Sequence, residues 1–184
     1  MCAGSEYPSG RRRAVQEAPP RYPKHPATTR TVIGTSRHDA DVPGVSDVVH
    51  PSRLVDVAPT VDAVVNTLPG TSATEHLLGK GFFDALRPGA SIVNVGRGNV
   101  IDEVALLDAL NSGRVGFAAL DVFETEPLPA HSPLWEHENV LVSPHTAALS
   151  AGEDRLIAEL FATNATRLLD GERLLNEVDT VEFY

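Results

Sequence analysis

The sequence predicts an α/β protein with a parallel sheet, a disordered N-terminal segment and a long C-terminal helix. From residue 31 onwards, short apolar runs alternate with stretches of helical periodicity. Such alternation is typical of βαβ units, whose sheet is covered by helices on both faces. Residues 1–30 contain five prolines and no apolar periodicity, so we expect them to be unstructured. Residues 151–171 have the amphipathic spacing of one helix that ends at Gly171.

The predicted strands are five short runs rich in β-branched and other apolar residues. In a parallel sheet of this kind, ligands bind beyond the carboxyl ends of the strands. Residues that directly follow these runs are therefore the first candidates for function. The runs are residues 31–36, the start of 62–71, 91–96, 116–123 and 139–144.

Two shorter helices are predicted between the strands. Residues 80–89 have helical spacing up to a closing Pro-Gly pair, which ends helices. Residues 102–115 begin with acidic residues and contain Gly113 near their end, and these are the expected signals at the two ends of a helix. The last eleven residues, 174–184, could add a strand or lie along a partner.

Charge and composition limit the class of function. The net charge is −10, but residues 1–30 hold six Lys/Arg and two acids, so the remainder carries −14. A body this acidic lacks the clustered cations that bind nucleic-acid phosphates, so we expect no nucleic-acid partner. No apolar run approaches the roughly 18 residues that span a membrane, and no apolar signal core begins the chain. With Cys2 as the single cysteine, a cytoplasmic location without membrane contact is expected.

Three side chains of complementary chemistry each follow a different predicted strand. Arg97 lies between Gly96 and Gly98, which permit a tight turn and the close approach of a ligand. Glu126 and His145 follow the next two strands. A guanidinium suits a carboxylate, and a histidine beside a carboxylate can act as a general acid near neutral pH. Each alone could be a surface or structural residue, but together they could hold and protonate a 2-oxo acid, with the hydride coming from a nicotinamide.

These residues lie in two long segments, VNVGRGNVIDEVALLDALNSGRVGFAALDVFETEPLP and SPLWEHENVLVSPHTAA. The segments resemble the D-isomer-specific 2-hydroxyacid dehydrogenase family, and the resemblance runs from about Thr31 to the C-terminus. It implies a partial, Rossmann-like, doubly wound parallel sheet. Residues 31–147 would be part of an NAD(P)-binding domain, and residues 148–184 a helix and tail of a substrate-binding domain. Residues 1–30 resemble nothing in the family.

The resemblance also implies a role for each candidate residue. Arg97 would bind the substrate carboxylate and carbonyl, and Glu126 would orient and tune His145, which would exchange the proton with the substrate oxygen. Glu126 is selected over Glu124 by its position before Pro127. Asp121 would lie near the nicotinamide carboxamide, and the 66–74 loop would form a wall of the cofactor site. The expected cofactor-binding residues are Ser36, Arg37, Thr67, Leu68, Pro69, Thr71, Val95, Gly96, Arg97, Asp121, His145 and Ala147, and no metal ligand is expected.

The end of the first predicted strand bears on the choice of cofactor. NAD-binding domains usually carry Asp or Glu at the end of their second strand, where it bonds the ribose hydroxyls. Here the corresponding residues are Thr35, Ser36 and Arg37. Small polar and cationic residues favour a 2′-phosphate, so NADP is favoured over NAD. Asp39, two residues further on, keeps NAD as the alternative.

The dinucleotide fingerprint G-x-G-x-x-G has no counterpart in the sequence. It should follow the first strand and open the first helix, yet the only glycines before Thr31 are Gly4 and Gly10. By the resemblance, the chain begins one βα unit late and lacks the N-terminal substrate-binding part. Two strands would then have open edges, and the N–H groups that bind the pyrophosphate would be missing. We therefore expect weak cofactor affinity and little turnover unless another chain supplies these parts.

Three functional hypotheses follow. The first is an oxidoreductase for the CH–OH group of 2-hydroxy acids, similar to glyoxylate or hydroxypyruvate reductases and impaired by truncation, which could form a homodimer. The second is a non-catalytic dimerisation or regulatory fragment, and the third is a decayed gene product. The presence of Arg97, Glu126 and His145 favours the first hypothesis.

Overall fold

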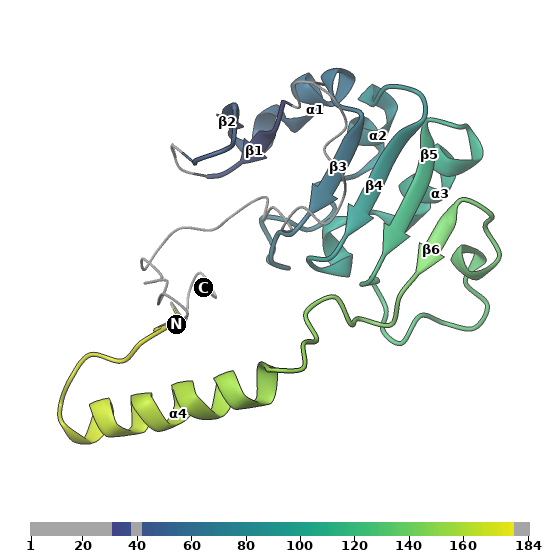
Figure 1. Cartoon of the computed structure of the whole chain (residues 1–184). Helices are drawn as coiled ribbons and strands as arrows, with labels where there is room; N and C mark the ends of the chain where they lie inside the picture. Colours follow the sequence, from purple (N-terminus) through teal and green to yellow (C-terminus); the bar gives the residue numbers. More distant parts are fainter. Residues whose placement is uncertain (1–30, 38–41, 179–184) are drawn as a thin grey trace, which may run out of the picture. The chain divides into compact units, whose positions relative to one another are not determined.

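A computed structural model describes residues 31–37 and 42–178, which divide into two compact units between Ala147 and Ala148. The first unit contains the parallel strands with their helices, and the second contains one long helix (Figure 1). The predicted disorder of residues 1–30 falls outside the described residues. Within the described ranges, no helix is both long enough and apolar enough to cross a membrane.

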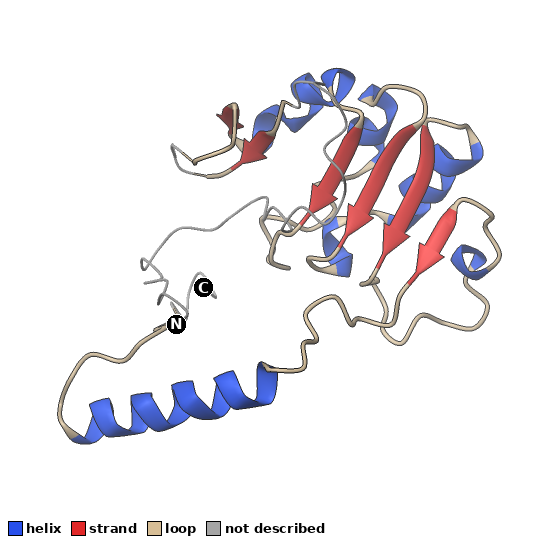
Figure 2. Ribbon diagram, viewed as in Figure 1, coloured by secondary structure: helices blue, strands red, loops and turns tan. Residues whose placement is uncertain are grey.

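The strands form two parallel sheets, which confirms the predicted α/β class. β3, β4, β5 and β6 form a four-stranded sheet whose spatial order follows the chain, and β1 and β2 form a separate pair. Helices connect β3 to β4 and β4 to β5, as parallel neighbours require. Figure 2 shows the strands and these helices in different colours. The bounds are β1 Ile33–Thr35, β2 Asp47–Val49, β3 Ala63–Asn66, β4 Ala90–Asn94, β5 Val115–Leu120 and β6 Val140–Val142.

The core lies between the four-stranded sheet and the helices α2 (Lys80–Ala85) and α3 (Glu103–Asn111). Because successive side chains of a strand point to opposite faces, every second residue of β4 is buried, from Ala90 to Asn94. On the opposite face of the sheet, apolar side chains remain exposed. They are Val65, Phe117 and Leu141.

The sequence explains where α3 and α2 begin and end. Asp102 caps α3 by accepting a hydrogen bond from the Ala105 N–H (3.0 Å), and Gly113 follows its end with a φ of +72°. α2 ends at Ala85, before the Pro-Gly pair at which its predicted range closed. Leu86 has left the helical conformation, with a ψ of 155°, and is buried, with 1% exposed. The next residue, Arg87, precedes Pro88, and a residue before a proline is disfavoured in the helical conformation. The helix therefore ends where its chain turns into the core.

Some elements of the fold were not predicted. β2 and the one-turn helix α1 (Leu54–Val57) lie between β1 and β3 in the chain, and short 3-10 turns occupy residues 51–53, 58–60, 98–100 and 133–135. Among the described residues, β1 pairs only with β2, and β3 only with β4. β1 and β3 thus each have one edge that pairs with no strand of the described residues.

The second unit is built on α4, Glu153–Leu169, which confirms the predicted long helix. None of its residues is buried, and Leu156, Ile157 and Phe161 are more than half exposed. The segment after the helix is held by Asn164, whose side chain bonds both backbone groups of Leu175 (2.8 and 3.0 Å). Residues 174–178 form no strand.

Candidate functional site

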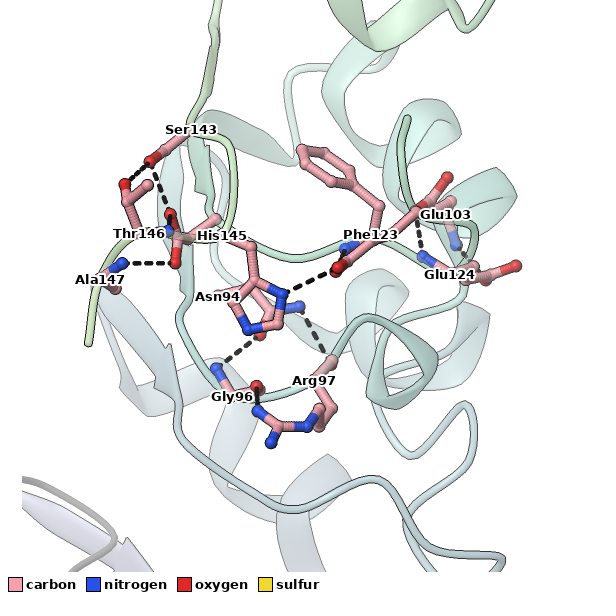
Figure 3. Close-up of polar contacts among 12 residues, drawn as sticks. Asn94, Gly96, Arg97, Glu103, Phe123, Glu124, Ser143, His145, Thr146 and Ala147 are labelled. Atoms are coloured by element: carbon pink, nitrogen blue, oxygen red, sulfur yellow. Dashed lines mark hydrogen bonds and ion pairs between the residues drawn. The ribbon is translucent and has the colours of Figure 1, made fainter. Parts of the chain in front are cut away.

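The structure brings Glu126 and His145 into direct contact at the carboxyl ends of β5 and β6. His145 Nδ1 lies 2.8 Å from Glu126 Oε2 (Figure 3). Arg97, which follows β4, is close enough for its charge to act on the Glu126 carboxyl. The three residues predicted to be catalytic therefore share one rim, because the carboxyl ends of neighbouring parallel strands lie at the same edge of a sheet.

Glu126 is held as an ionised acceptor. Burial alone would raise its pKa, but the hydrogen bonds from His145 and from the Phe123 N–H, and the charges of His145 and Arg97, hold the pKa below its ordinary range. The Phe123 N–H donates to Oε1 (3.0 Å), while Oε2 faces His145. Since an ionised carboxylate only accepts hydrogen bonds, His145 Nδ1 must carry the proton. Nε2 is then the ring nitrogen left to act on a ligand.

Asp121 holds the loop that carries His145. Its carboxylate accepts hydrogen bonds from the N–H groups of Thr146 and Ala147, both at 2.8 Å, and from the Ser143 hydroxyl. His145 itself has a φ of +55°, which is uncommon for a residue with a side chain. Conformations of this kind persist where the surroundings fix them. Bonds on both sides of His145 anchor this turn to the end of β5.

The electrostatics of Asp121 suit this supporting contact. Its side chain is 5% exposed, and such burial would by itself raise the pKa. The hydrogen bonds from Ser143, Thr146 and Ala147, with the nearby His145, lower the pKa below its ordinary range instead. The family resemblance implied a place near the nicotinamide carboxamide for Asp121 and a cofactor-binding role for Ala147. In the structure, the Asp121 carboxylate and the Ala147 N–H bond to each other.

Two buried asparagines support the rim, and neither was predicted from the sequence. Asn66 and Asn94 end β3 and β4 in register, and Asn66 Nδ2 donates to Asn94 Oδ1 (2.8 Å). Asn66 Oδ1 accepts from the Leu68 N–H (3.1 Å), and Asn94 Nδ2 donates to the Arg97 carbonyl (3.3 Å). The repeated ending V-V-N and I-V-N was the available signal. An asparagine that ends an apolar strand can bond both the next strand and its own loop.

The glycines on either side of Arg97 make room for protein backbone. A Cβ at Gly96 would lie 2.7 Å from the Leu68 carbonyl oxygen, and one at Gly98 would overlap the Phe123 backbone. Ligand approach was the reason inferred from the sequence. The structure shows that the loops after β3 and β5 converge on the turn that carries Arg97 and allow no side chain there.

The other candidate cofactor residues lie in separate parts of the rim. The loop containing Thr67, Leu68, Pro69 and Thr71 follows β3 and is closed by Thr74, whose hydroxyl donates to the Pro69 carbonyl (2.6 Å). Val95 follows β4 and is partly exposed, at 39%. The remaining two candidate cofactor residues follow β1, which belongs to the two-stranded sheet, whereas the three candidate catalytic residues follow strands of the four-stranded sheet. The two residues after β1 are Ser36 and Arg37. Among the described residues, no cluster of His, Cys, Asp and Glu could hold a metal ion.

A parallel α/β sheet with polar side chains gathered at its carboxyl rim defines a nucleotide-binding domain of the Rossmann type. The family model of the D-isomer-specific 2-hydroxyacid dehydrogenase NAD-binding domain matches residues 26–147. The chain therefore belongs to the D-isomer-specific 2-hydroxyacid dehydrogenase family, as the sequence predicted.

Similar proteins agree with this assignment. Glyoxylate/hydroxypyruvate reductase A of Citrobacter koseri is 36% identical over 149 residues, which are 81% of this chain and 47% of that protein. A D-isomer specific 2-hydroxyacid dehydrogenase of Xanthobacter autotrophicus, solved with NADPH and MES, has a TM-score of 0.77 at 41% identity, covering 83% of this chain and 62% of that one. The NADPH-dependent glyoxylate/hydroxypyruvate reductase of Sinorhizobium meliloti, solved with NADP and sulfate, has a TM-score of 0.77 at 33% identity, with 84% and 49% covered. The chain spans about half the length of the curated relatives it matches.

The close approach at Gly98 predicts a position-specific cost for adding a methyl group. Gly98→Ala should lower the free energy of unfolding by about 2 kcal/mol or more, because the Cβ would overlap the Phe123 backbone. Gly81→Ala is the matched control: no atom lies within 4 Å of its Cβ position in α2, so a stabilisation of up to about 1 kcal/mol is expected. Urea unfolding measures the free energy of unfolding of both variants. Equal effects would contradict the packing argument.

The bonded carboxylate of Asp121 predicts a pH-dependent loss in Asp121→Asn. Because folding lowers the pKa of this carboxyl, its contribution is fully present at neutral pH and is lost as the pH falls through the lowered pKa, below about 4. We expect the free energy of unfolding of the variant to be about 2 kcal/mol lower than that of the wild type at pH 7, and the difference to shrink in acid. Asp108→Asn, an exposed change on α3, is the control. A pH-independent difference would count against an ionised Asp121.

Proposed function

We propose that this domain serves an oxidoreductase that interconverts 2-oxo and 2-hydroxy acids with NAD(P). The observation that carries the proposal is the bonded pair His145–Glu126, 2.8 Å apart, on the same rim as Arg97. An ionised carboxylate fixes the histidine tautomer, and a guanidinium beside it provides a site for a carboxylate ligand. Reduction of a 2-oxo acid needs both of these features.

The proposed proton transfer follows from the tautomer. In reduction, His145 enters protonated on both nitrogens, and Nε2 gives its proton to the carbonyl oxygen of the substrate. Glu126 accepts the Nδ1–H bond throughout and stabilises the imidazolium form. In oxidation, the neutral Nε2 takes the hydroxyl proton back. Arg97 binds the substrate carboxylate and orients the carbonyl toward His145.

The residues of the rim fit the nicotinamide end of a dinucleotide. Val95 offers a partly exposed apolar surface beside Arg97, and the loop from Thr67 to Thr71 forms the neighbouring segment. When bound, the cofactor supplies or accepts the hydride. Ser36 and Arg37 at the end of β1 favour the 2′-phosphate of NADP. The NADPH and NADP complexes of the similar Xanthobacter and Sinorhizobium proteins support this preference.

The substrate is proposed to be a small 2-oxo acid such as glyoxylate or hydroxypyruvate, by similarity to the reductases that match the chain. Turnover also needs surfaces that bind the pyrophosphate and enclose the substrate, which we propose are contributed by polypeptide beyond residues 31–178. We further propose that residues 31–147 form the cofactor-binding part, and that α4 belongs to the substrate-binding part.

One observation favours a second candidate function. The apolar side chains of α4 are exposed along the helix, as expected of a segment that packs against another protein surface. A non-catalytic dimerisation or regulatory module would use this helix and would not need Arg97, Glu126 or His145. Size measurement together with the enzyme assays below separates the two functions.

The proton-transfer proposal predicts a loss of turnover in His145→Gln. With NADPH and glyoxylate or hydroxypyruvate, kcat should fall by a factor of about 100 or more, because the general acid is removed. His137→Gln, in the loop at the amino end of β6, should leave kcat unchanged. The rate of NADPH consumption, followed by absorbance at 340 nm, gives kcat for both variants. Measurable turnover that is equal in the wild type and in His145→Gln would overturn the role of His145, whereas a wild-type dimer without turnover would favour the second function.

The cofactor preference predicts an asymmetric effect of Arg37→Ala. Loss of the guanidinium should weaken NADPH binding about tenfold and NADH binding far less, because only NADPH carries the 2′-phosphate. Titration followed by the fluorescence of Trp135, the only tryptophan, or by calorimetry measures both affinities. Arg53→Ala is the matched control at an exposed arginine. An equal loss for both cofactors would contradict a 2′-phosphate contact.

A further inference from the structure

A second group of ionisable side chains lies beside the catalytic candidates and has no part in the proposed reaction. Glu124 Oε1 lies 3.1 Å from His76 Nε2 and accepts the Glu103 N–H at 3.0 Å. In return, Glu103 Oε1 accepts the Glu124 N–H at 2.7 Å (Figure 3). His76 belongs to the segment between β3 and α2, Glu103 begins α3, and Glu124 follows β5. These contacts therefore tie three separate segments together.

The backbone at His76 is also specialised. Its φ is +47°, in the left-handed region that few residues with side chains adopt. Its N–H donates to the Asn99 carbonyl (2.8 Å), two residues after Arg97. Leu78 continues this pairing through its N–H to the Val100 carbonyl (3.0 Å). An uncommon conformation at the end of a paired segment points His76 at Glu124, and such conformations concentrate at functional sites.

A short path links this group to the catalytic candidates. Glu124 directly follows Phe123, whose N–H donates to Glu126 Oε1 (3.0 Å), and Glu126 Oε2 faces His145. The peptide between Phe123 and Glu124 also lies against Gly98, next to Arg97. The Phe123 N–H belongs to the adjoining peptide, between Val122 and Phe123, so a shift of Glu124 would reach Glu126 through the backbone of Phe123.

We propose that His76, Glu103 and Glu124 form a positioning clamp that sets the tautomer of His145 through the Phe123–Glu126 contact. The clamp holds the 123–126 loop so that the Phe123 N–H stays on Glu126, whose second oxygen then retains the Nδ1 proton of His145. Its catalytic importance rests on the proposed function, but its effect on His145 can be measured without turnover.

The charges of the clamp explain how two acids can lie together. Burial raises the pKa of Glu103, and the charge of Glu124 adds to this effect, although the Glu124 N–H bond opposes it. Both carboxylates lie at the N-terminus of α3, where the helix dipole favours negative charge. His76 supplies a further donor to Glu124.

Nuclear magnetic resonance of the full chain tests the clamp. The ring nitrogen shifts of His145 report its tautomer, and hydrogen exchange reports the Phe123 amide. His76→Asn keeps a residue that tolerates a left-handed backbone but is too short to reach Glu124. Glu124→Ala removes both of its side-chain contacts, and Glu124→Gln keeps an oxygen for the Glu103 N–H. His137→Asn, in the loop before β6, is the matched control.

We expect the wild type, the control and Glu124→Gln to keep the proton of neutral His145 on Nδ1. His76→Asn and Glu124→Ala should move part of it to Nε2 and speed exchange of the Phe123 amide about tenfold, the equivalent of about 1.4 kcal/mol. An unchanged tautomer and unchanged Phe123 exchange in His76→Asn would overturn the proposal, even if its melting temperature fell. Should Glu124→Ala unfold, His76→Asn decides alone. Failure of the proposed function would instead appear as absent NADPH binding or turnover with the clamp effect intact.

Discussion

The buried carboxylate of Asp121 is the contact on which the functional rim depends. It lies one residue beyond β5 and binds the turn after β6 through two N–H groups and the Ser143 hydroxyl. These three bonds lower the pKa of the carboxyl despite its burial, so it stays ionised and keeps all three donors. The turn can then hold His145 at a φ of +55° with its ring toward Glu126. A neutral side chain at this position could not match so many donors.

The same construction recurs along the rim. β3 and β4 end in Asn66 and Asn94, and Asp121 directly follows β5; each of these side chains bonds a neighbouring strand or a loop of the rim. Buried polar groups cost stability unless they are paired, and here each pairing fixes a loop that carries a candidate functional residue. Close packing of backbone against Gly96 and Gly98 completes the arrangement. The rim is therefore rigid where the proposed chemistry needs fixed positions.

Two surfaces of the chain stand in contrast to this rim. One face of the four-stranded sheet exposes Phe117 and Leu141, and α4 exposes Ile157 and Phe161. Apolar side chains of this size are usually covered in an α/β fold, where helices protect both faces. The chain spans about half the length of its curated relatives.

The sequence by itself determined the parallel α/β class, most of the strands and helices, the family, and the three residues that meet at the rim. Alternating apolar runs, end signals such as Asp102 and Gly113, and local motifs carry this information along the chain. Only the tertiary structure decided the rest. Three features depend on contacts between residues 19 or more positions apart. They are the hydrogen bonds of Asp121, the Asn66–Asn94 pair and the link from His76 to Glu124. Such contacts follow from the register and proximity of whole strands, and no local pattern records them.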